Sequence, residues 1–232
     1  MSSAGPPRPR AVLLDALGTL LKLEPPGPRL RAELAQRFGV SVSEDDAERA
    51  IGVEIAYYRA HLDEGRDPKA LTSLRRACAE VLRGALPQSA RAALADPDSL
   101  TAALLASLRF RAYDEVKPAL AAYRSHGRRL VVVSNWDVSL HGVLEDLGLR
   151  AAIDRVLTSA EAGARKPSPV IFEQALALAG VPAPAAIHVG DSLAEDVAGA
   201  RAAGIEPVLI RRDGSPGPPD VRTVASLAQL VW

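Results

Sequence analysis

Side chains able to do chemistry follow the apolar runs of this sequence. They comprise a carboxylate, a hydroxyl beside an amide, a cation and a further pair of carboxylates. Phosphoryl transfer needs a nucleophile and countercharge for the phosphate oxygens, and a carboxylate can be that nucleophile. Carboxylates together with substrate phosphate also suit Mg²⁺. In chain order the candidates are Asp15, Ser134, Asn135, Lys166, Asp191 and Asp196.

Short apolar segments position these residues. Alternating with helical patterns, they predict a parallel sheet flanked by helices, whose strands end at one edge, where α/β proteins bind their ligands. The predicted strands cover 11–14, 128–134, 154–159, 185–190 and 207–212, and the predicted helices 116–126, 138–148, 169–180 and 193–203. A short helix near 223–230 is expected to close the chain.

The segment between the first strand and residue 110 has a different, helical pattern. Leu30, Leu34 and Phe38 recur at four-residue spacing before Gly39, and Ser43 is a plausible N-cap for the next helix. Further helices are expected over 69–85, 87–95 and 98–108. We therefore expect an all-helical cap domain over 23–110, inserted into an α/β core formed by 10–22 and 111–232.

The predicted cap carries three side chains that could line a substrate site. Tyr57, Tyr58 and His61 lie close together on one expected helix. A packed helix face is the competing structural explanation, and the notion of a substrate-lining role depends on the face that these residues occupy.

Composition limits the class of protein. Lysine plus arginine equals aspartate plus glutamate at 28 each, so no basic excess indicates a nucleic-acid partner. No apolar run is long enough to span a membrane. The single cysteine, Cys78, excludes an intramolecular disulfide framework and favours a reducing, cytoplasmic location. We expect a small-molecule substrate, and the sequence does not predict an oligomeric state.

Taken together and in this order, the motifs resemble those of the haloacid dehalogenase superfamily. Asp15 with Gly18 and Thr19 is similar to the first motif, and Ser134 to the second. The remaining two correspond to Lys166-Pro167 and to Gly190-Asp191 with Asp196. The resemblance implies a Rossmann-like core with a subfamily I helical cap. The second motif, Ser-Asn-aromatic-Asp, is most similar to that of the REG-2-like proteins.

The resemblance also implies roles for the residues. Asp15 would be the nucleophile, with Ser134, Asn135 and Lys166 on the phosphate. Mg²⁺ would be bound by Asp15, Asp191 and the backbone carbonyl of Leu17, and Asp196 would orient water or Lys166.

Leu17 departs from the pattern of the superfamily's phosphatases, which usually carry an aspartate there to protonate the leaving oxygen. Loss of such an acid lowers rates by about 100- to 10,000-fold. Dehalogenases also lack this aspartate, because a departing halide needs no proton. We therefore expect a Mg²⁺-dependent phosphatase with reduced activity. The alternatives are a metal-independent 2-haloacid dehalogenase and a catalytically weak phosphate-binding protein.

Structural roles compete for several of these residues. Asp196 could be a first-turn helix carboxylate with Ser192 as the cap, and Asp137 is expected to cap the helix that follows it. His188 alternates within a strand, so a buried core role is expected for it.

Overall fold

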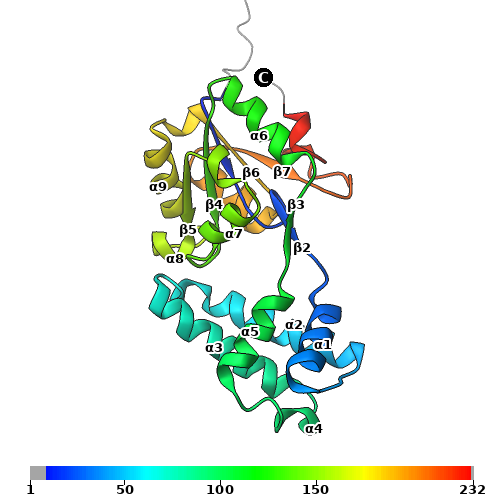
Figure 1. The fold of residues 1–232 in the computed structure, drawn as a ribbon. Coiled ribbons are helices and arrows are strands. Elements are labelled where there is room, and N and C mark those ends of the chain that lie inside the picture. The colour runs from blue at the N-terminus through cyan, green and yellow to red at the C-terminus, as the bar shows by residue number, and fades with distance from the viewer. Residues whose placement is uncertain (1–8, 231–232) are drawn as a thin grey trace, which may run out of the picture. The chain divides into compact units, whose positions relative to one another are not determined.

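A computed structural model describes residues 9–230 of the chain. It divides the chain into two compact units, which Figure 1 shows as ribbons. Among the described residues, the first unit combines 9–22 with 112–230, and the second is Leu23–Arg111. Each unit is described by itself below.

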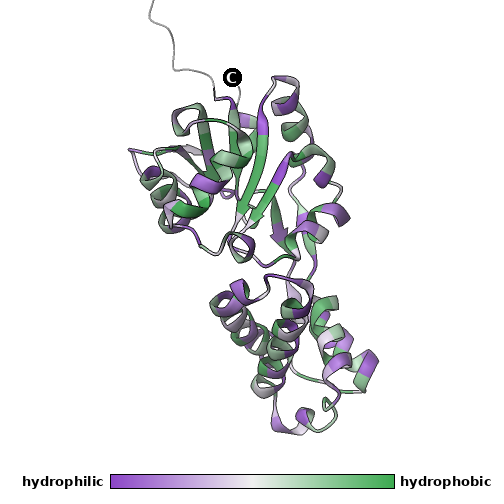
Figure 2. Ribbon diagram, turned by 90° about the vertical axis from the view of Figure 1, so that its left-hand side faces the viewer, coloured by the Kyte–Doolittle hydropathy of each residue, from purple (hydrophilic) through white to green (hydrophobic). Residues whose placement is uncertain are grey.

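The first unit is built on a six-stranded sheet in which every neighbouring pair of strands is parallel. Its inner strands are apolar along most of their length, as expected for a parallel sheet covered on both faces, and Figure 2 shows much of these strands in the hydrophobic colour. The predicted α/β fold class is therefore confirmed. The spatial order is β5 (Arg155–Thr158), β4 (Arg129–Ser134), β1 (Ala11–Leu14), β6 (Ala186–Gly190), β7 (Glu206–Ile210) and β8 (Arg222–Val224).

Helices cover this sheet. Phe172 and Ile171 of α9 pack with Leu13 and Val131 in one buried cluster, and α6 contacts β4. The helices of this unit are α6 (Val116–Ser125), α7 (Leu140–Asp146), α8 (Ser159–Ala162), α9 (Pro169–Ala179) and α10 (Ala198–Ala202), with 3₁₀ turns at Arg150–Ala152 and Ala183–Ala185.

Two predicted helices of the α/β unit were wrong in detail. The segment near 223–230 begins as strand β8, because Val221, Thr223 and Val224 favour an extended backbone at the sheet's end. Only one 3₁₀ turn follows, Leu227–Gln229. The helix predicted over 193–203 begins as a π-helical turn, Leu193–Val197, before α10.

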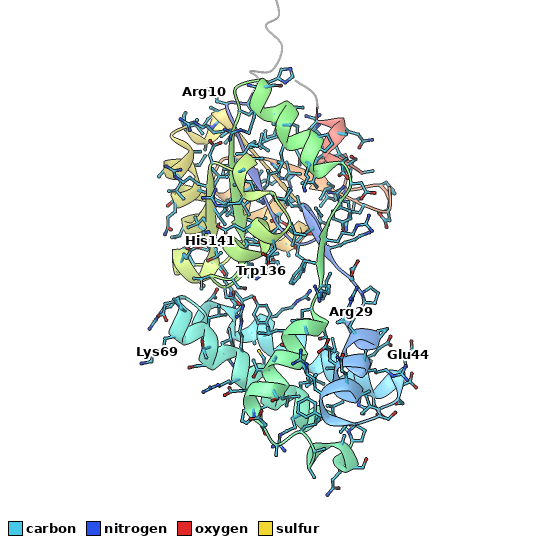
Figure 3. The ribbon with its side chains drawn as sticks, in the orientation of Figure 1. Arg10, Arg29, Glu44, Lys69, Trp136 and His141 are labelled. Carbon is cyan, nitrogen blue, oxygen red and sulfur yellow. The ribbon has the colours of Figure 1, made fainter. Side chains whose placement is uncertain are left out.

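The second unit is formed by helices around one hydrophobic cluster. Gly39 ends α1 in the left-handed conformation with φ 66°, and the Ser43 side chain caps α2, as predicted. Figure 3 labels Glu44 and Lys69 in the first turns of α2 and α3. The elements are α1 (Pro26–Phe38), α2 (Glu44–His61), the 3₁₀ turn Leu62–Glu64, α3 (Pro68–Ala85), α4 (Gln88–Arg91) and α5 (Pro97–Ser107).

The chain passes between the units in two short strands that were not predicted from the sequence. β2 (Leu21–Leu23) and β3 (Phe110–Ala112) pair with each other in a separate sheet. Three residues per strand are too few to show a period.

Within residues 9–230, no helix has both the length and the apolar character needed to span a membrane. The cytoplasmic location inferred from the single cysteine stays a prediction.

Candidate active site

Asp15 follows the fully buried strand β1, and its backbone N–H donates to the Val189 carbonyl of β6 at 2.9 Å. The chain then turns sharply, because the amides of Leu20 and Leu21 both bond to the Ala16 carbonyl. Gly18 permits this turn with φ 83°, a value that other residues rarely adopt. The Asp15 side chain is held at the carboxyl edge of the sheet and is only 6% exposed.

Lys166 is the central cation of this edge. Its Nζ lies 2.6 Å from Oδ1 of Asp15 and 2.6 Å from Oδ1 of Asp196, and it is itself buried. Ser134 Oγ donates to the same Asp15 oxygen at 2.9 Å. The structure thus brings three predicted catalytic residues, Asp15, Ser134 and Lys166, into direct contact.

Asp196 is held by donors on both of its oxygens. Oδ1 accepts from Lys166 and lies 2.8 Å from Nε2 of His188, while Oδ2 accepts from the Ser192 backbone N–H at 3.0 Å. The π-helical turn places Asp196 in the interior, since the amides of Asp196 and Val197 both bond to the Ser192 carbonyl. Ser192 also caps this turn, as the structural alternative for the motif predicted.

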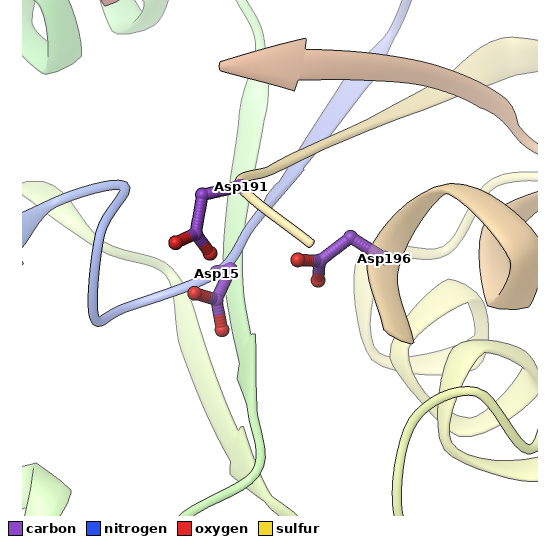
Figure 4. Close-up of side chains that lie close together, drawn as sticks. All are labelled: Asp15, Asp191 and Asp196. Atoms are coloured by element: carbon purple, nitrogen blue, oxygen red, sulfur yellow. The ribbon is translucent and has the colours of Figure 1, made fainter. Parts of the chain in front are cut away.

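Asp191 is the exposed member of the carboxylate group. One oxygen from each of Asp15, Asp191 and Asp196 lies within 4.8 Å of the others, and Figure 4 shows the three carboxylates converging. Asp191 packs directly on Gly18, where an added Cβ would meet its Oδ2 at 2.2 Å. Gly190 is equally constrained, because a Cβ there would lie 2.1 Å from the Asp196 carboxyl carbon.

Burial and charge act differently on these groups. Burial, opposed by Lys166, raises the pKa of Asp15 to about 6. Desolvation and the negative charge of Asp196 raise the pKa of Asp191. Against the effect of burial, Lys166 and His188 hold the pKa of Asp196 well below its usual range. Burial would also lower the pKa of Lys166, but the two carboxylates raise it, so the lysine stays charged.

Asn135 and Leu17, two further predicted site residues, make contacts with backbone groups at this edge of the sheet. The Asn135 side chain bonds to both backbone groups of Lys166, donating to its carbonyl at 3.0 Å and accepting from its N–H at 2.8 Å. These bonds position the loop that carries Lys166, and the predicted phosphate contact of Asn135 stays a prediction. Leu17 is half-buried and forms a bridge with Leu21 inside the turn.

Asp137 accepts a hydrogen bond from its own loop. Its Oδ1 accepts from the backbone N–H of Ser139 at 2.7 Å, just before α7. The N-cap residue of α7 is Ser139, and among residues 9–230 no side chain caps this helix, so the predicted N-cap role of Asp137 was wrong. Its bond lies in the turn that precedes the helix.

The three cap candidates lie together on α2. The rings of Tyr57 and His61 stack with centres 4.0 Å apart, and His61 Nδ1 lies 2.8 Å from the Tyr57 carbonyl oxygen. Tyr57 and Tyr58 also pack against the hydrophobic cluster of the helical unit. All three are half-buried.

The sequence reading did not single out Arg212. This residue follows β7 and bonds to the turn that carries Gly18 and Thr19. A single arginine at the end of a strand gives no sequence signal of such a contact. His188 was expected to be a core residue, and it is fully buried, but its bond to Asp196 places it in the same network as Asp15.

Comparison with known proteins agrees with this geometry. A family model described as haloacid dehalogenase-like hydrolase matches residues 9–204. The human haloacid dehalogenase-like hydrolase domain-containing protein 3 is 45% identical over 97 residues, which cover 42% of this chain and 39% of that protein. Its mouse counterpart is 32% identical over 87% of this chain and 81% of its own length.

An enzyme relative and two solved structures are also similar. The ribulose-1,5-bisphosphate 5-phosphatase of Halopiger xanaduensis is 38% identical over 41% of this chain and 40% of its own length. A phosphatase structure from Thermococcus onnurineus superimposes with a TM-score of 0.64 at 25% identity, over 95% of both chains. The 2-haloacid dehalogenase of Pseudomonas syringae shares the fold, with a TM-score of 0.65 at 24% identity over 95% and 96% of the chains.

Proposed function

The chain belongs to the haloacid dehalogenase-like hydrolases, a family of enzymes, and from this premise we propose a Mg²⁺-dependent phosphatase of small phosphorylated metabolites. The observation that carries the proposal is the contact of Lys166 with both Asp15 and Asp196, beside the exposed carboxylate of Asp191. Relatives whose names state phosphatase activity support it.

In the proposed reaction Asp15 is the nucleophile. Ser134 and Lys166 both bond to Oδ1, which leaves Oδ2 free of those donors to attack phosphorus. The Oδ2–P bond forms as the bond from phosphorus to the leaving oxygen breaks, and that oxygen departs with the electron pair. Water then attacks phosphorus, the Oδ2–P bond breaks with its electron pair going back to the Asp15 carboxylate, and phosphate is released while the proton of the water passes to solvent. Lys166 supplies countercharge to the phosphoryl oxygens throughout.

The residues present fit a divalent cation. Asp15 and Asp191 offer carboxylate oxygens, which Mg²⁺ prefers, and Asp191 is open to solvent. The Gly18 backbone leaves room for Asp191 that any side chain would fill. Asp15, Asp191 and the Leu17 carbonyl would hold Mg²⁺, which would relieve repulsion between the Asp15 carboxylate and an anionic substrate. Asp196 fits this role less well, because its oxygens already accept from Lys166, His188 and the Ser192 amide.

Leu17 shapes the proposed substrate preference. A leucine at this place in the turn neither protonates a leaving oxygen nor activates water. We therefore expect acyl and aryl phosphates, whose leaving groups are stable as anions, to react faster than alkyl phosphates. A halide also leaves without a proton, so a metal-independent dehalogenase is the second candidate, and a phosphate-binding protein with little turnover is the third.

The helical unit is proposed to act as a cap that selects the substrate. Tyr57, Tyr58 and His61 are its candidates for contact with a substrate, because their half-buried rings leave part of each surface accessible.

A substrate panel assayed with and without Mg²⁺ tests these proposals. It contains p-nitrophenyl phosphate, acetyl phosphate, an alkyl phosphate and 2-chloropropionate, with Asp15→Asn as the inactive control. Mg²⁺-dependent turnover of the first two, with alkyl phosphate slower, would support the phosphatase. Metal-independent chloride release would select the dehalogenase, and tight phosphate binding without turnover the third candidate. Alanine at each cap candidate should reorder the substrates.

A further inference from the structure

Arg212 joins separate segments of the α/β unit. Its Nε donates to the Gly18 carbonyl at 3.4 Å, and its Nη2 donates to the Thr19 carbonyl. Its Nη1 pairs with the carboxylate of Glu115. The guanidinium carbon lies 3.8 Å from the centre of the Tyr113 ring.

These contacts use what only arginine provides. The planar guanidinium presents several fixed donors and stacks on an aromatic face, whereas a lysine ammonium is a single point of charge. The Arg212 side chain is only 17% exposed, so its bonds are partly shielded from water. Although burial opposes it, the ion pair lowers the pKa of Glu115, so the pair stays charged.

The segment that Arg212 holds is the turn that follows Asp15. The carbonyls of Gly18 and Thr19 bond to Arg212, while the Gly18 Cα packs against Asp191. Since a Cβ at Gly18 would lie only 2.2 Å from an Asp191 oxygen, a small shift of the turn changes the space available to that carboxylate. Arg212 is therefore placed to set the spacing between the turn and Asp191.

Tyr113 and Glu115 add a second connection. They directly follow β3, where the chain re-enters the α/β unit at Ala112. The Tyr113 backbone N–H also bonds to the Leu20 carbonyl at 3.1 Å, so the re-entering segment touches the same turn.

We propose that Arg212 is a positioning residue for the reaction, which fixes the turn after Asp15 and ties it to the segment re-entering from the helical unit. The proposal rests on the proposed function for its effect on rate. The held geometry of the turn is a separate consequence that can be measured without any substrate.

The test compares Arg212→Gln and Arg212→Lys with Arg201→Gln. Arg201 is a matched control, because it also bonds to a carbonyl and a carboxylate, those of Asp220, but on an exposed surface. Hydrogen exchange is measured at the amides of Gly18, Leu20 and Leu21, which the turn's own hydrogen bonds protect. The turnover number kcat and the Michaelis constant KM are measured with p-nitrophenyl phosphate and Mg²⁺.

In Arg212→Gln these amides should exchange about tenfold faster, because the turn opens locally more often. The kcat should fall by about 10- to 100-fold with little change in KM, since a small misplacement of catalytic groups costs rate. Arg212→Lys should recover part of both, and Arg201→Gln should change neither. Glu115→Gln, which leaves the guanidinium in place, should show the same changes at smaller size.

Unchanged exchange in Arg212→Gln and Glu115→Gln, or equal effects in Arg201→Gln, would overturn the positioning role. Faster exchange with unchanged kcat would also overturn it, since the held turn would then not serve the reaction. If the unmodified protein hydrolyses no phosphate ester, the proposed function fails, while the exchange data still decide whether Arg212 holds the turn.

Discussion

The two units each bury a carboxylate, and they treat it in opposite ways. In the α/β unit, Asp196 is 1% exposed and accepts from a charged lysine, an imidazole and a backbone amide. In the helical unit, Glu54 on α2 is 3% exposed, and the bond that acts on its ionisation comes from the thiol of Cys78. Their exposures are almost equal.

The ionisation of the two groups nevertheless differs in direction. The pKa of Asp196 lies well below its usual range, whereas burial, only partly offset by Cys78, raises the pKa of Glu54 to about 7. The number and charge of the donors therefore decide which form is stable, and burial alone does not. Among the three carboxylates of the candidate site, Asp196 is the one whose charge these donors compensate.

Among the substitutions considered, removing Lys166 should have the largest effect, because this lysine stabilises the ionised form of the buried carboxylates. Lys166→Met would leave Asp15 and Asp196 buried without their shared cation, and breaking a buried ion pair costs about 3–5 kcal/mol of unfolding free energy. The loss of unfolding free energy should be larger at pH 8 than at pH 5, because the buried carboxylates can take up protons at the lower pH. Urea unfolding without metal measures it.

Arg201→Met is the matched control for this variant. It removes an exposed ion pair with Asp220, so stability should hardly change. A Lys166→Met variant as stable as this control would contradict the view that the lysine compensates the buried carboxylates.

Glu54→Gln should have the next largest effect and should depend on pH. The folded-state pKa of Glu54, about 7, lies above its ordinary 4.5, so folding favours the protonated form. Its stabilising contribution is complete below pH 4.5 and is lost as the pH rises to 7. Converted to free energy, this pKa shift corresponds to a loss of about 3 kcal/mol at most in the free energy of unfolding. The variant, which cannot ionise, should be more stable than the unmodified protein at pH 8 and about equal to it at pH 4.5.

Unfolding curves between pH 4.5 and 8 check this prediction. Glu48→Gln, an exposed position on the same helix, should leave the pH dependence unchanged. If Glu54→Gln kept the full pH dependence, the cause would lie in another group.

The sequence predicted most of the α/β fold because its strands are continuous apolar runs. β1 and β4 are buried along nearly their whole length, and the glycines after the helices mark their ends. Strands of three residues, such as β2, β3 and β8, carry too little pattern. They form because neighbouring segments offer them hydrogen-bond partners, which sequence alone does not display.

The residues of the candidate site also fall into a group that the sequence predicted and a group that it did not. Most of the candidate residues lie at the ends of apolar strands or in the segments just after them, and parallel strands end at one edge of a sheet, so their proximity could be predicted. These residues are Asp15, Ser134, Asp191 and Asp196, while Lys166 lies in the loop before α9. Arg212 and Asn135 act through backbone carbonyls and amides, which carry no residue identity. Their partners could be found only once the turns were built.

His188→Leu should give the smallest effect. His188 Nε2 lies on Asp196 while Nδ1 is buried without a partner among residues 9–230, so a neutral ring that donates from Nε2 fits best. Leucine fills similar space beside Phe172 but removes that donor. Because Lys166 and the Ser192 amide remain on Asp196, the loss should be about 1–2 kcal/mol, below that of Lys166→Met. His188→Gln, which keeps a donor, should recover part of it. If His188→Leu proved as destabilising as Lys166→Met, the three donors to Asp196 would stabilise it cooperatively. The difference in ionisation between Asp196 and Glu54 would then depend on the whole hydrogen-bond network and not on the lysine alone.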